Sequence, residues 1–304
     1  MKVCIIIPAL NEEEFIGELI DSINLNSYKE KEIIVVDDGS DDKTVEIAKQ
    51  KGAKVFVNSP GRMGPAFGFN FAAKKTDAEI LCAVDADFYF SDKNFIKKAV
   101  DVFDEKTVAV YTSYKVFQDT LIEKICSNKQ GISTDPLFIR RDVFLELGGY
   151  PLIGFSEDHL FTIKLKEYVK KNKLKEKILK NAYFSHHAVR TLSELYVQAR
   201  WYGKNTIPFI KMWPKKPRFF GLSSVFLPPV YFISFIFSIF SFYNIFFSIF
   251  FVPFFYVILL TIYQYWKSKN IFVLGQIFTF LVFGLGMLHG LLIYLFWFDG
   301  KYGY

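Results

Sequence analysis

Short β-rich runs alternate with helical patterns along the first 110 residues of the chain. Apolar and β-branched residues predict five strands, at Val3–Ile7, Glu32–Val36, Lys54–Val57, Glu79–Val84 and Val108–Tyr111. The segments between them predict four helices, near Glu13–Asn24, Lys43–Lys51, Pro65–Lys75 and Asn94–Phe103. Strands that alternate with helices in this way are typical of an α/β fold with a mainly parallel sheet.

The pattern becomes less regular after residue 111. The stretch "PLFIRRDVFLELGGY" predicts a strand, a short helix and a Gly-Gly turn, and "EDHLFTIKLKEYVKK" predicts a helix that begins at an acidic pair. A further strand is predicted in "KILKNAYFSHH", and an amphipathic helix in "TLSELYVQARWYGKNTIPFIKMW". We expect these elements to complete a first domain at 1–205, followed by an interfacial connector at 206–218.

The last part of the chain is apolar, and almost all of its residues lack charge. Three runs have no charged residue inside them: Phe219–Phe242, Ile245–Tyr263 and Ile271–Phe298. About 20 such residues suffice to cross a bilayer. The sequence therefore predicts a membrane domain at 219–304 with about three transmembrane helices.

Charges beside these runs predict an orientation. Basic residues precede the first run at Lys211, Lys215, Lys216 and Arg218, and lie between the second and third at Lys267 and Lys269. By the positive-inside rule, both segments face the cytoplasm. Three cysteines, an odd number, fit a reducing compartment. We expect a multi-pass protein of the cell membrane, without a signal peptide, whose catalytic domain is cytoplasmic.

Polar clusters follow four of the predicted strands. They are Asn11-Glu12, "DDGSDD" from Asp37, "SPGRMGP" around Arg62 and Gly64, and "DAD" from Asp85 to Asp87. In a parallel sheet, ligands bind beyond the carboxyl ends of the strands. Four polar loops at one edge therefore predict a binding site there.

Asp85 and Asp87 stand one residue apart, after the apolar run "ILCAV". In an extended chain, residues i and i+2 point to the same side, so the two carboxylates would converge. Paired oxygen ligands suit a hard divalent cation such as Mg²⁺ or Mn²⁺. The alternative is a pair of carboxylates that cap a turn or a helix.

Taken in order, several motifs resemble the family 2 glycosyltransferases of GT-A fold. They are "IIIPALNEE", "VVDDGSDD", "GRMGPAFGFNFA", "VDAD", "GGY" with "SEDHLF", and "QARWYG". The resemblance covers most of residues 1–205 and implies a Rossmann-like GT-A domain. It extends to enzymes directed at polyprenyl phosphates or other lipids, and "VDAD" corresponds to the DxD element.

The resemblance implies roles for residues of the first loops. Asp37 would recognise the base of the nucleotide, with an Asx turn as the alternative, and Asp38 would be structural. Glu12 would contact the ribose, and its alternative role is that of an acid at a helix N-terminus. Residues expected to bind the nucleotide sugar are Pro8, Ala9, Asn11, Glu12, Asp37, Arg62, Gly64, Asp85 and Arg200.

The acidic pair Glu157-Asp158 lies at a predicted helix start, where acids are also ordinary caps. The resemblance makes Asp158 the catalytic base, which removes a proton from the acceptor hydroxyl. A lipid phosphate acceptor would need no base, because its oxygen is already ionised, and Asp158 would then position it. The resemblance also implies that Asp87 meets the metal directly, whereas Asp85 also faces the ribose.

His186 and His187 follow a predicted strand, near the position where many GT-A enzymes complete the metal sphere with a histidine. Either residue is a candidate ligand, and an ordinary structural histidine is the alternative. Gln198, Arg200 and Trp201 resemble part of the Q(Q/R)xRW element of processive synthases, but Val197 stands at its first Gln position. An interfacial helix with Trp201 at headgroup level is the alternative.

The sequence therefore predicts a membrane-bound, inverting, metal-dependent glycosyltransferase. Its donor would be a UDP- or GDP-linked sugar, and its acceptor a membrane lipid, a polyprenyl phosphate or a lipid-linked sugar. The alternatives are a processive polysaccharide synthase and a non-catalytic scaffold that binds nucleotide sugars. We expect no nucleic-acid partner.

Overall fold

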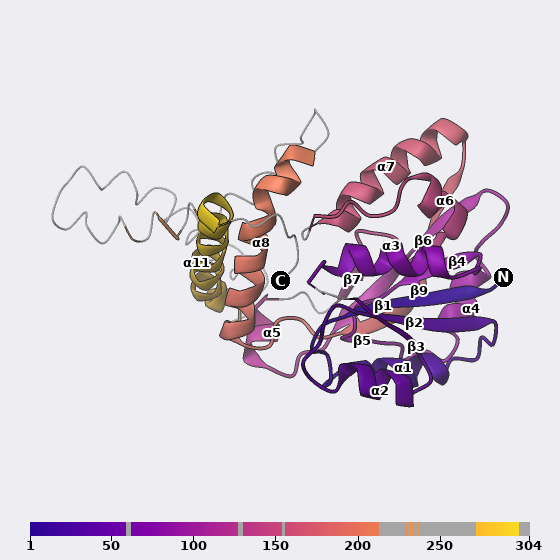
Figure 1. The fold of residues 1–304 in the computed structure, drawn as a ribbon, viewed down its shortest axis with the longest axis horizontal. Coiled ribbons are helices and arrows are strands. Elements are labelled where there is room, and N and C mark those ends of the chain that lie inside the picture. The colour runs from indigo at the N-terminus through magenta and orange to yellow at the C-terminus, as the bar shows by residue number, and fades with distance from the viewer. Residues whose placement is uncertain are drawn as a thin grey trace. The chain divides into compact units, whose positions relative to one another are not determined.

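The computed structural model describes residues 1–58, 62–126, 130–153, 156–212, 229, 232–233, 236 and 272–297. The chain divides into two compact units. The first, which we call the sheet unit, comprises 1–117, 129–187 and 301–304, and the second, the helical unit, comprises 118–128 and 188–300. Figure 1 shows the elements of both units, coloured by residue number.

One nine-stranded sheet forms the centre of the sheet unit. Its strands are β1 (Val3–Ala9), β2 (Lys31–Asp37), β3 (Lys54–Val57), β4 (Ile80–Ala83), β5 (Phe88–Tyr89), β6 (Thr107–Val116), β7 (Gln130–Ile132), β8 (Phe138–Arg140) and β9 (Lys175–His186). They follow the order β3-β2-β1-β4-β8-β6-β9-β5, and β7 pairs with β6. The first four strands of this order are parallel, whereas β8 runs antiparallel to both β4 and β6.

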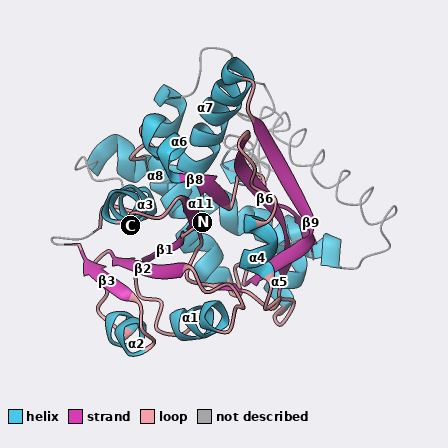
Figure 2. Ribbon diagram, turned by 90° about the vertical axis from the view of Figure 1, so that its right-hand side faces the viewer, coloured by secondary structure: helices cyan, strands magenta, loops and turns pink. Residues whose placement is uncertain are grey.

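Six described helices belong to the sheet unit and cover both faces of its sheet. They are α1 (Ile16–Asn24), α2 (Thr44–Gln50), α3 (Pro65–Lys75), α4 (Phe95–Val100), α6 (Arg141–Glu146) and α7 (Glu157–Asn172). Residues of β1 alternate between two cores: Val3, Ile5 and Ile7 pack with α1 and α4, and Cys4 and Ile6 pack with α3, α6 and α7. Figure 2 shows α1 and α2 below the parallel strands, and α3 and α6 above them.

The predicted α/β fold is confirmed. Parallel pairing is less extensive than the alternation suggested, because β8 enters between β4 and β6 in the opposite direction. The first helix begins three residues later than predicted. Residues 12–15 instead form a turn, in which the Glu12 carbonyl accepts bonds from the N–H groups of Phe15 (3.1 Å) and Ile16 (3.0 Å).

The described helices of the helical unit are α5 (Leu121–Cys126), α8 (Leu192–Met212) and α11 (Phe272–Trp297). The backbones of α8 and α11 approach closely because glycines line their contact. A Cβ at Gly203 would lie 1.9 Å from the Met287 carbonyl oxygen, and one at Gly290 would lie 1.8 Å from that of Arg200. The Tyr196 hydroxyl of α8 also bonds the His289 Nδ1 of α11.

The predicted membrane localisation requires a correction. Of the predicted spans, Phe219–Phe242 and Ile245–Tyr263 lie almost entirely outside the described residues, and only Ile271–Phe298 coincides with a described helix, α11. Within the described ranges, no helix combines the length and the apolar character that a membrane crossing requires. This finding contradicts the predicted multi-pass placement in the cell membrane. Hydropathy misled because an apolar run also serves helix packing, as that of α11 does against α8.

The predicted domain boundaries stay a prediction. Helix α8 continues through residue 205, so the connector that was expected from 206 begins inside a regular helix. Thr191 caps the start of α8, because its hydroxyl accepts a bond from the Glu194 N–H (3.1 Å). The Glu194 carboxylate in turn accepts a bond from the Arg190 N–H (2.9 Å).

Candidate active site

The carboxyl ends of four parallel strands meet at one edge of the sheet. Ala9 of β1 pairs with Asp37 of β2, which pairs with Val57 of β3, so these three strands end level with one another. Strand β4 ends at Ala83, opposite Ile6. The loops that carry most of the predicted site residues therefore leave the sheet side by side.

Hydrogen bonds between their backbones and side chains join the first two loops. Asn11 has a left-handed φ of 57°, its N–H donates to Ser40 Oγ (2.8 Å), and its side-chain oxygen accepts from the Asp41 N–H (2.8 Å). The Glu12 N–H donates to Thr44 Oγ1 (2.7 Å). Asn11, an exposed residue, thus fixes one loop against the other.

Asp37 and Asp38 are both buried and both hydrogen-bonded, but to different partners. Asp37, 1% exposed, accepts bonds from the N–H groups of Gly39 and Ser40 (3.1 Å each) and from the Ser40 hydroxyl, which makes an Asx turn. The Asp38 carboxylate accepts from Asn58 Nδ2 (2.7 Å), the Met63 N–H (3.0 Å) and the Gly64 N–H (2.7 Å). Asp38 therefore fixes the start of α3.

Arg62 and Gly64 adopt left-handed backbone conformations at the start of α3, with φ angles of 64° and 83°. The Arg62 guanidinium is partly exposed, and its Nη2 lies 3.4 Å from Asp41 Oδ2. Gly68 in the next turn packs tightly, because a Cβ there would lie 3.2 Å from the Pro8 Cβ. Pro8 thus lies against α3 and is partly accessible, whereas Ala9 is buried in the core on the other face of the sheet.

Asp85 and Asp87 lie in a turn, which corrects the extended conformation expected for them. The Phe88 N–H donates to the Asp85 carbonyl (3.2 Å), and Ala86 and Asp87 form the turn itself. The two carboxylates are nevertheless close enough to interact. Lost hydration raises the pKa of Asp87 well above its ordinary value, and the charges of Asp85 and Glu12 raise it further.

Glu12 belongs to the same group of carboxylates. Burial raises its pKa to about 7, and the charges of Asp85 and Asp42 add to the rise. The pKa of Asp85 is also raised by lost hydration, although its side chain remains exposed to solvent. Three carboxylates that repel one another at a strand end favour a bound cation.

Glu157 and Asp158 form the first turn of α7, after Ser156 in a left-handed conformation (φ 53°). Burial and the charge of Asp158 raise the pKa of Glu157 to about 8. Burial and the charge of Asp135 raise the pKa of Asp158 to about 7. The Asp85 charge raises both values, so the acidic pair lies within electrostatic range of the loop after β4.

Asn70 of α3 holds the segment that leads to this pair. Its Nδ2 donates to the Tyr150 carbonyl (2.7 Å), and its Oδ1 accepts from the Tyr150 N–H (2.8 Å). The Tyr150 ring is buried against Phe69, Phe144 and Phe161. Sequence reasoning missed Asn70, although its position inside the "GRMGPAFGFNFA" motif was a usable signal.

His186 ends β9, directly opposite Phe88, so it lies one position from Asp87 in the ladder. Its ring contacts Phe88 and Tyr114, and its Nδ1 lies 3.0 Å from the His187 carbonyl oxygen. The His187 ring stacks on Phe117, with ring centroids 4.5 Å apart, and also contacts Phe15. Both histidines are partly accessible, and both stay candidate ligands.

Arg200 is the one predicted donor-binding residue that lies in the helical unit. Its side chain is exposed on α8, and its carbonyl oxygen contacts Gly290. A place for Arg200 beside the nucleotide sugar stays a prediction.

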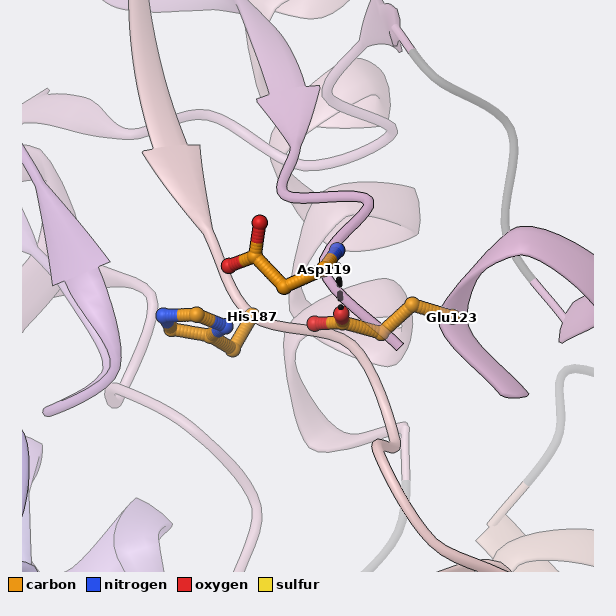
Figure 3. A group of neighbouring side chains, drawn as sticks. All are labelled: Asp119, Glu123 and His187. Atoms are coloured by element: carbon orange, nitrogen blue, oxygen red, sulfur yellow. Dashed lines mark hydrogen bonds between the residues drawn. The ribbon is translucent and has the colours of Figure 1, made fainter. Parts of the chain in front are cut away.

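A further acidic pair, Asp119 and Glu123, lies at the start of α5 in the helical unit. Figure 3 shows the Glu123 carboxylate accepting a bond from the Asp119 N–H, at 3.0 Å. The same carboxylate accepts from the Thr120 N–H (2.9 Å), while the Thr120 hydroxyl accepts from the Glu123 N–H (3.1 Å). This capping box explains why a fully buried glutamate is tolerated here.

Comparison with known proteins places these observations in a family. Residues 4–164 match the sequence model of glycosyl transferase family 2. The chain is 30% identical over 185 residues to the poly(ribitol-phosphate) beta-N-acetylglucosaminyltransferase TarS of Staphylococcus aureus, covering 54% of this chain and 32% of that protein. It is 32% identical over 107 residues to the 4,4'-diaponeurosporenoate glycosyltransferase of Staphylococcus haemolyticus, covering 34% and 28%.

One solved structure resembles nearly the whole chain. It is the mannosyltransferase PcManGT from Pyrobaculum calidifontis in complex with GDP-Man and Mn²⁺, with a TM-score of 0.53 over 97% of this chain and 87% of that one. At 14% identity, this likeness carries the fold alone. The chain spans about a third of the length of each of these two curated relatives.

Proposed function

Because the chain belongs to glycosyl transferase family 2, we propose that it transfers a sugar, with inversion, from a nucleoside diphosphate sugar to an acceptor. The observation that carries this proposal is the group of mutually repelling carboxylates beside the parallel strand ends. Glu12, Asp85 and Asp87 approach from two loops, and Glu157 and Asp158 from α7. Raised pKa values of this kind cluster at functional sites.

The donor nucleotide would bind to the loops after β1, β2 and β3. Asp37 would accept a bond from the base, since its oxygens are oriented by the turn behind them. Glu12 and Asn11 would contact the ribose, with Pro8, Ala9 and Gly64 lining the same loops. Arg62 would attract the diphosphate, because its guanidinium is only loosely paired, at 3.4 Å from Asp41. Arg200 is a further candidate for that role.

The residues after β4 fit a divalent cation. Asp85 and Asp87 supply oxygen donors, and their repulsion is relieved by a bound positive charge. We propose that these two residues, with His186 or His187, hold Mg²⁺ or Mn²⁺. Such a cation stabilises the charge that develops on a diphosphate leaving group.

Asp158 would act as the base for a hydroxyl acceptor. A general base must be ionised near neutral pH yet able to hold a proton, and a pKa of about 7 meets both conditions. Glu157, with a pKa of about 8, is largely protonated at neutral pH and can donate a hydrogen bond to substrate. Inversion follows if the acceptor attacks from the face opposite the leaving nucleotide.

We propose a lipid or lipid-linked acceptor, and the relative that is a 4,4'-diaponeurosporenoate glycosyltransferase supports an apolar one. TarS, by contrast, is a poly(ribitol-phosphate) beta-N-acetylglucosaminyltransferase, which makes a polyol phosphate the competing acceptor class.

A transfer assay tests the proposal. Full-length protein is incubated with radiolabelled UDP-glucose, UDP-N-acetylglucosamine or GDP-mannose, with Mg²⁺ or Mn²⁺, and with a lipid extract or ribitol phosphate polymer. We expect one donor to release its nucleoside diphosphate, with label in the solvent-extractable lipid. Label in long polymer alone would favour a processive synthase. No turnover of any donor, with the folded protein binding neither UDP nor GDP, would contradict the proposed function.

A further inference from the structure

Asp135 is a carboxylate in the segment between β7 and β8, and the backbone on both sides of it is fixed. The Ser133 N–H donates to the Thr112 carbonyl (2.9 Å), and the Leu137 N–H donates to the Val110 carbonyl (3.1 Å). Pro136, the next residue, further restricts the chain because its ring sets φ. Both acceptors belong to β6, so the sheet itself holds Asp135 in place.

The two oxygens of Asp135 are in different situations. Oδ2 accepts a bond from the Thr134 hydroxyl (2.8 Å). Oδ1 is buried and has no hydrogen-bond partner within the part of the chain that the structure describes, and the side chain as a whole is 18% exposed. The Nδ1 of His159 lies 4.0 Å from Oδ1, which is too long for a hydrogen bond.

Asp135 lies near the proposed base Asp158, because its Oδ1 is 4.0 Å from the Nδ1 of His159, the next residue of α7. Its negative charge is the largest electrostatic cause of the raised pKa of Asp158, and it also raises the pKa of Glu157 and Tyr150. The other titratable groups facing this region are Asp85, from the loop after β4, His159, from α7, and Tyr111 of β6, whose hydroxyl bonds Glu176.

We propose that Asp135 binds a hydroxyl group of the sugar that is transferred, through its buried Oδ1. The assignment rests on the proposed glycosyltransferase function and adds a residue that selects the donor sugar. A buried carboxylate oxygen without a donor destabilises the protein, so an arriving hydroxyl that donates to it recovers part of that cost.

The chemistry around Asp135 selects a hydroxyl over other ligands. A phosphate group would be repelled by Asp135 and by the neighbouring Asp158, whereas a neutral hydroxyl donates to a carboxylate. An ionised carboxylate is acceptor-only, so it discriminates a sugar that carries the hydroxyl from one that lacks it. The fixed backbone on both sides of Asp135 suits it to this discrimination, because the oxygen does not need to be reoriented on binding.

Calorimetry of donor binding tests this assignment. In the presence of Mn²⁺, the full-length protein is titrated with its donor and, separately, with the matching nucleoside diphosphate. The donor is the one of UDP-glucose, UDP-N-acetylglucosamine and GDP-mannose that the protein turns over. We expect Asp135→Ala to weaken nucleotide-sugar binding about tenfold or more, and to leave nucleoside diphosphate binding within about twofold. Asp135→Asn, which keeps the shape, tests the charge in a variant that preserves packing.

Matched measurements complete the test. Asp142→Asn makes the same chemical change on α6, where Asp142 is exposed and accepts a bond from the Val143 N–H (2.8 Å). We expect this variant to bind both ligands as the unmodified protein does. Donors that each lack one sugar hydroxyl identify the group that Asp135 binds. One of these donors should bind the unmodified protein more weakly than the complete donor does. The Asp135→Ala variant should bind that donor and the complete donor equally well.

Three results would overturn the assignment while leaving the proposed function intact. They are unchanged donor binding in both Asp135 variants, equal weakening of the nucleotide sugar and the nucleoside diphosphate, and an effect on the acceptor KM alone. By contrast, an unmodified protein that binds none of the three donors would contradict the proposed function itself.

Discussion

Two sets of acidic residues lie at the same edge of the sheet, and they differ in how their oxygens are satisfied. Asp37 and Asp38 accept several hydrogen bonds each from neighbouring N–H and O–H groups. In contrast, Asp87, Glu157 and Asp158 have raised pKa values because lost hydration and neighbouring negative charges disfavour ionisation.

This difference separates acids that stabilise the fold, which we call framework acids, from acids whose charge favours a bound ligand. Carboxylates that accept hydrogen bonds from neighbouring N–H and O–H groups hold loops in place, and their charge is already stabilised by the protein. Acids that repel one another are stable only with a proton, a cation or a substrate donor. The comparison predicts opposite consequences for Asp38 and for the repelling acids, because removing Asp38 should cost stability and removing a repelling acid should cost activity. Asp37 combines both roles, since the turn that satisfies its carboxylate also orients it for the proposed contact with the base.

The largest expected effect is on catalysis, from Asp87→Asn. Loss of one proposed cation ligand should reduce turnover by about 10³-fold or more, because the charge on the leaving diphosphate is no longer stabilised. The variant should fold at least as well as the unmodified protein, since a repelling charge has been removed. Initial rates of nucleoside diphosphate release and a thermal unfolding curve check both parts. A large fall in Tm would place Asp87 in the framework instead.

Asp158→Asn should reduce kcat by about 10²–10³-fold with a hydroxyl acceptor. The Kd for the nucleotide sugar should change little, because the base acts on the acceptor. With a phosphate acceptor, whose oxygen is already ionised, the loss should be much smaller. Comparing the two acceptor classes in one assay therefore also tests which class is used, and equal small losses with both would contradict the role of Asp158 as a base.

Asp38→Ala should show the opposite pattern to Asp87→Asn. The change leaves the N–H groups of Met63 and Gly64 and the Asn58 amide without an acceptor, which should lower the free energy of unfolding by about 2–3 kcal/mol. Urea denaturation measures this loss of unfolding free energy, as a lower midpoint with an unchanged slope m. Asp142→Asn on α6 is a control that should change stability by less than about 0.5 kcal/mol.

The smallest effect is the pH dependence of stability without added metal. Glu157 and Asp158 have folded-state pKa values of about 8 and about 7, above those of an unfolded chain, so the folded state binds protons more tightly. Their contribution to stability is therefore largest at low pH and is lost as pH rises from about 4 to about 8. We expect Glu157→Gln to flatten the change in Tm between pH 6 and pH 8. An unchanged slope would contradict the raised values.

The sequence predicted the parallel half of the sheet better than the antiparallel half. Short apolar and β-branched runs with helices between them define β1 to β4, whereas β8 inserts between β4 and β6 through contacts distant in the chain. The carboxylate motifs were found because they follow strands directly. Asn70 and Asp135 were missed because their roles depend on Tyr150 and α7, which no local spacing relates to them.

Local patterns also misled at two places. The pairing of Asp85 and Asp87 was inferred from an extended chain, but it arises from a turn closed by the Phe88 N–H. Hydropathy predicted membrane spans, which the described helices do not support. The apolar character of α11 reflects in part its close packing on α8, where Gly286 and Gly290 meet the neighbouring backbone.

The central claim is that Asp87 and its neighbours hold a divalent cation together with a nucleoside diphosphate. Electron paramagnetic resonance of Mn²⁺, titrated with full-length protein in the presence of UDP or GDP, measures this binding directly. We predict that one of the two nucleotides tightens Mn²⁺ binding by at least about tenfold, and that Asp87→Asn abolishes the enhancement. Equal Mn²⁺ binding by the unmodified protein and Asp87→Asn, with either nucleotide, would contradict the account.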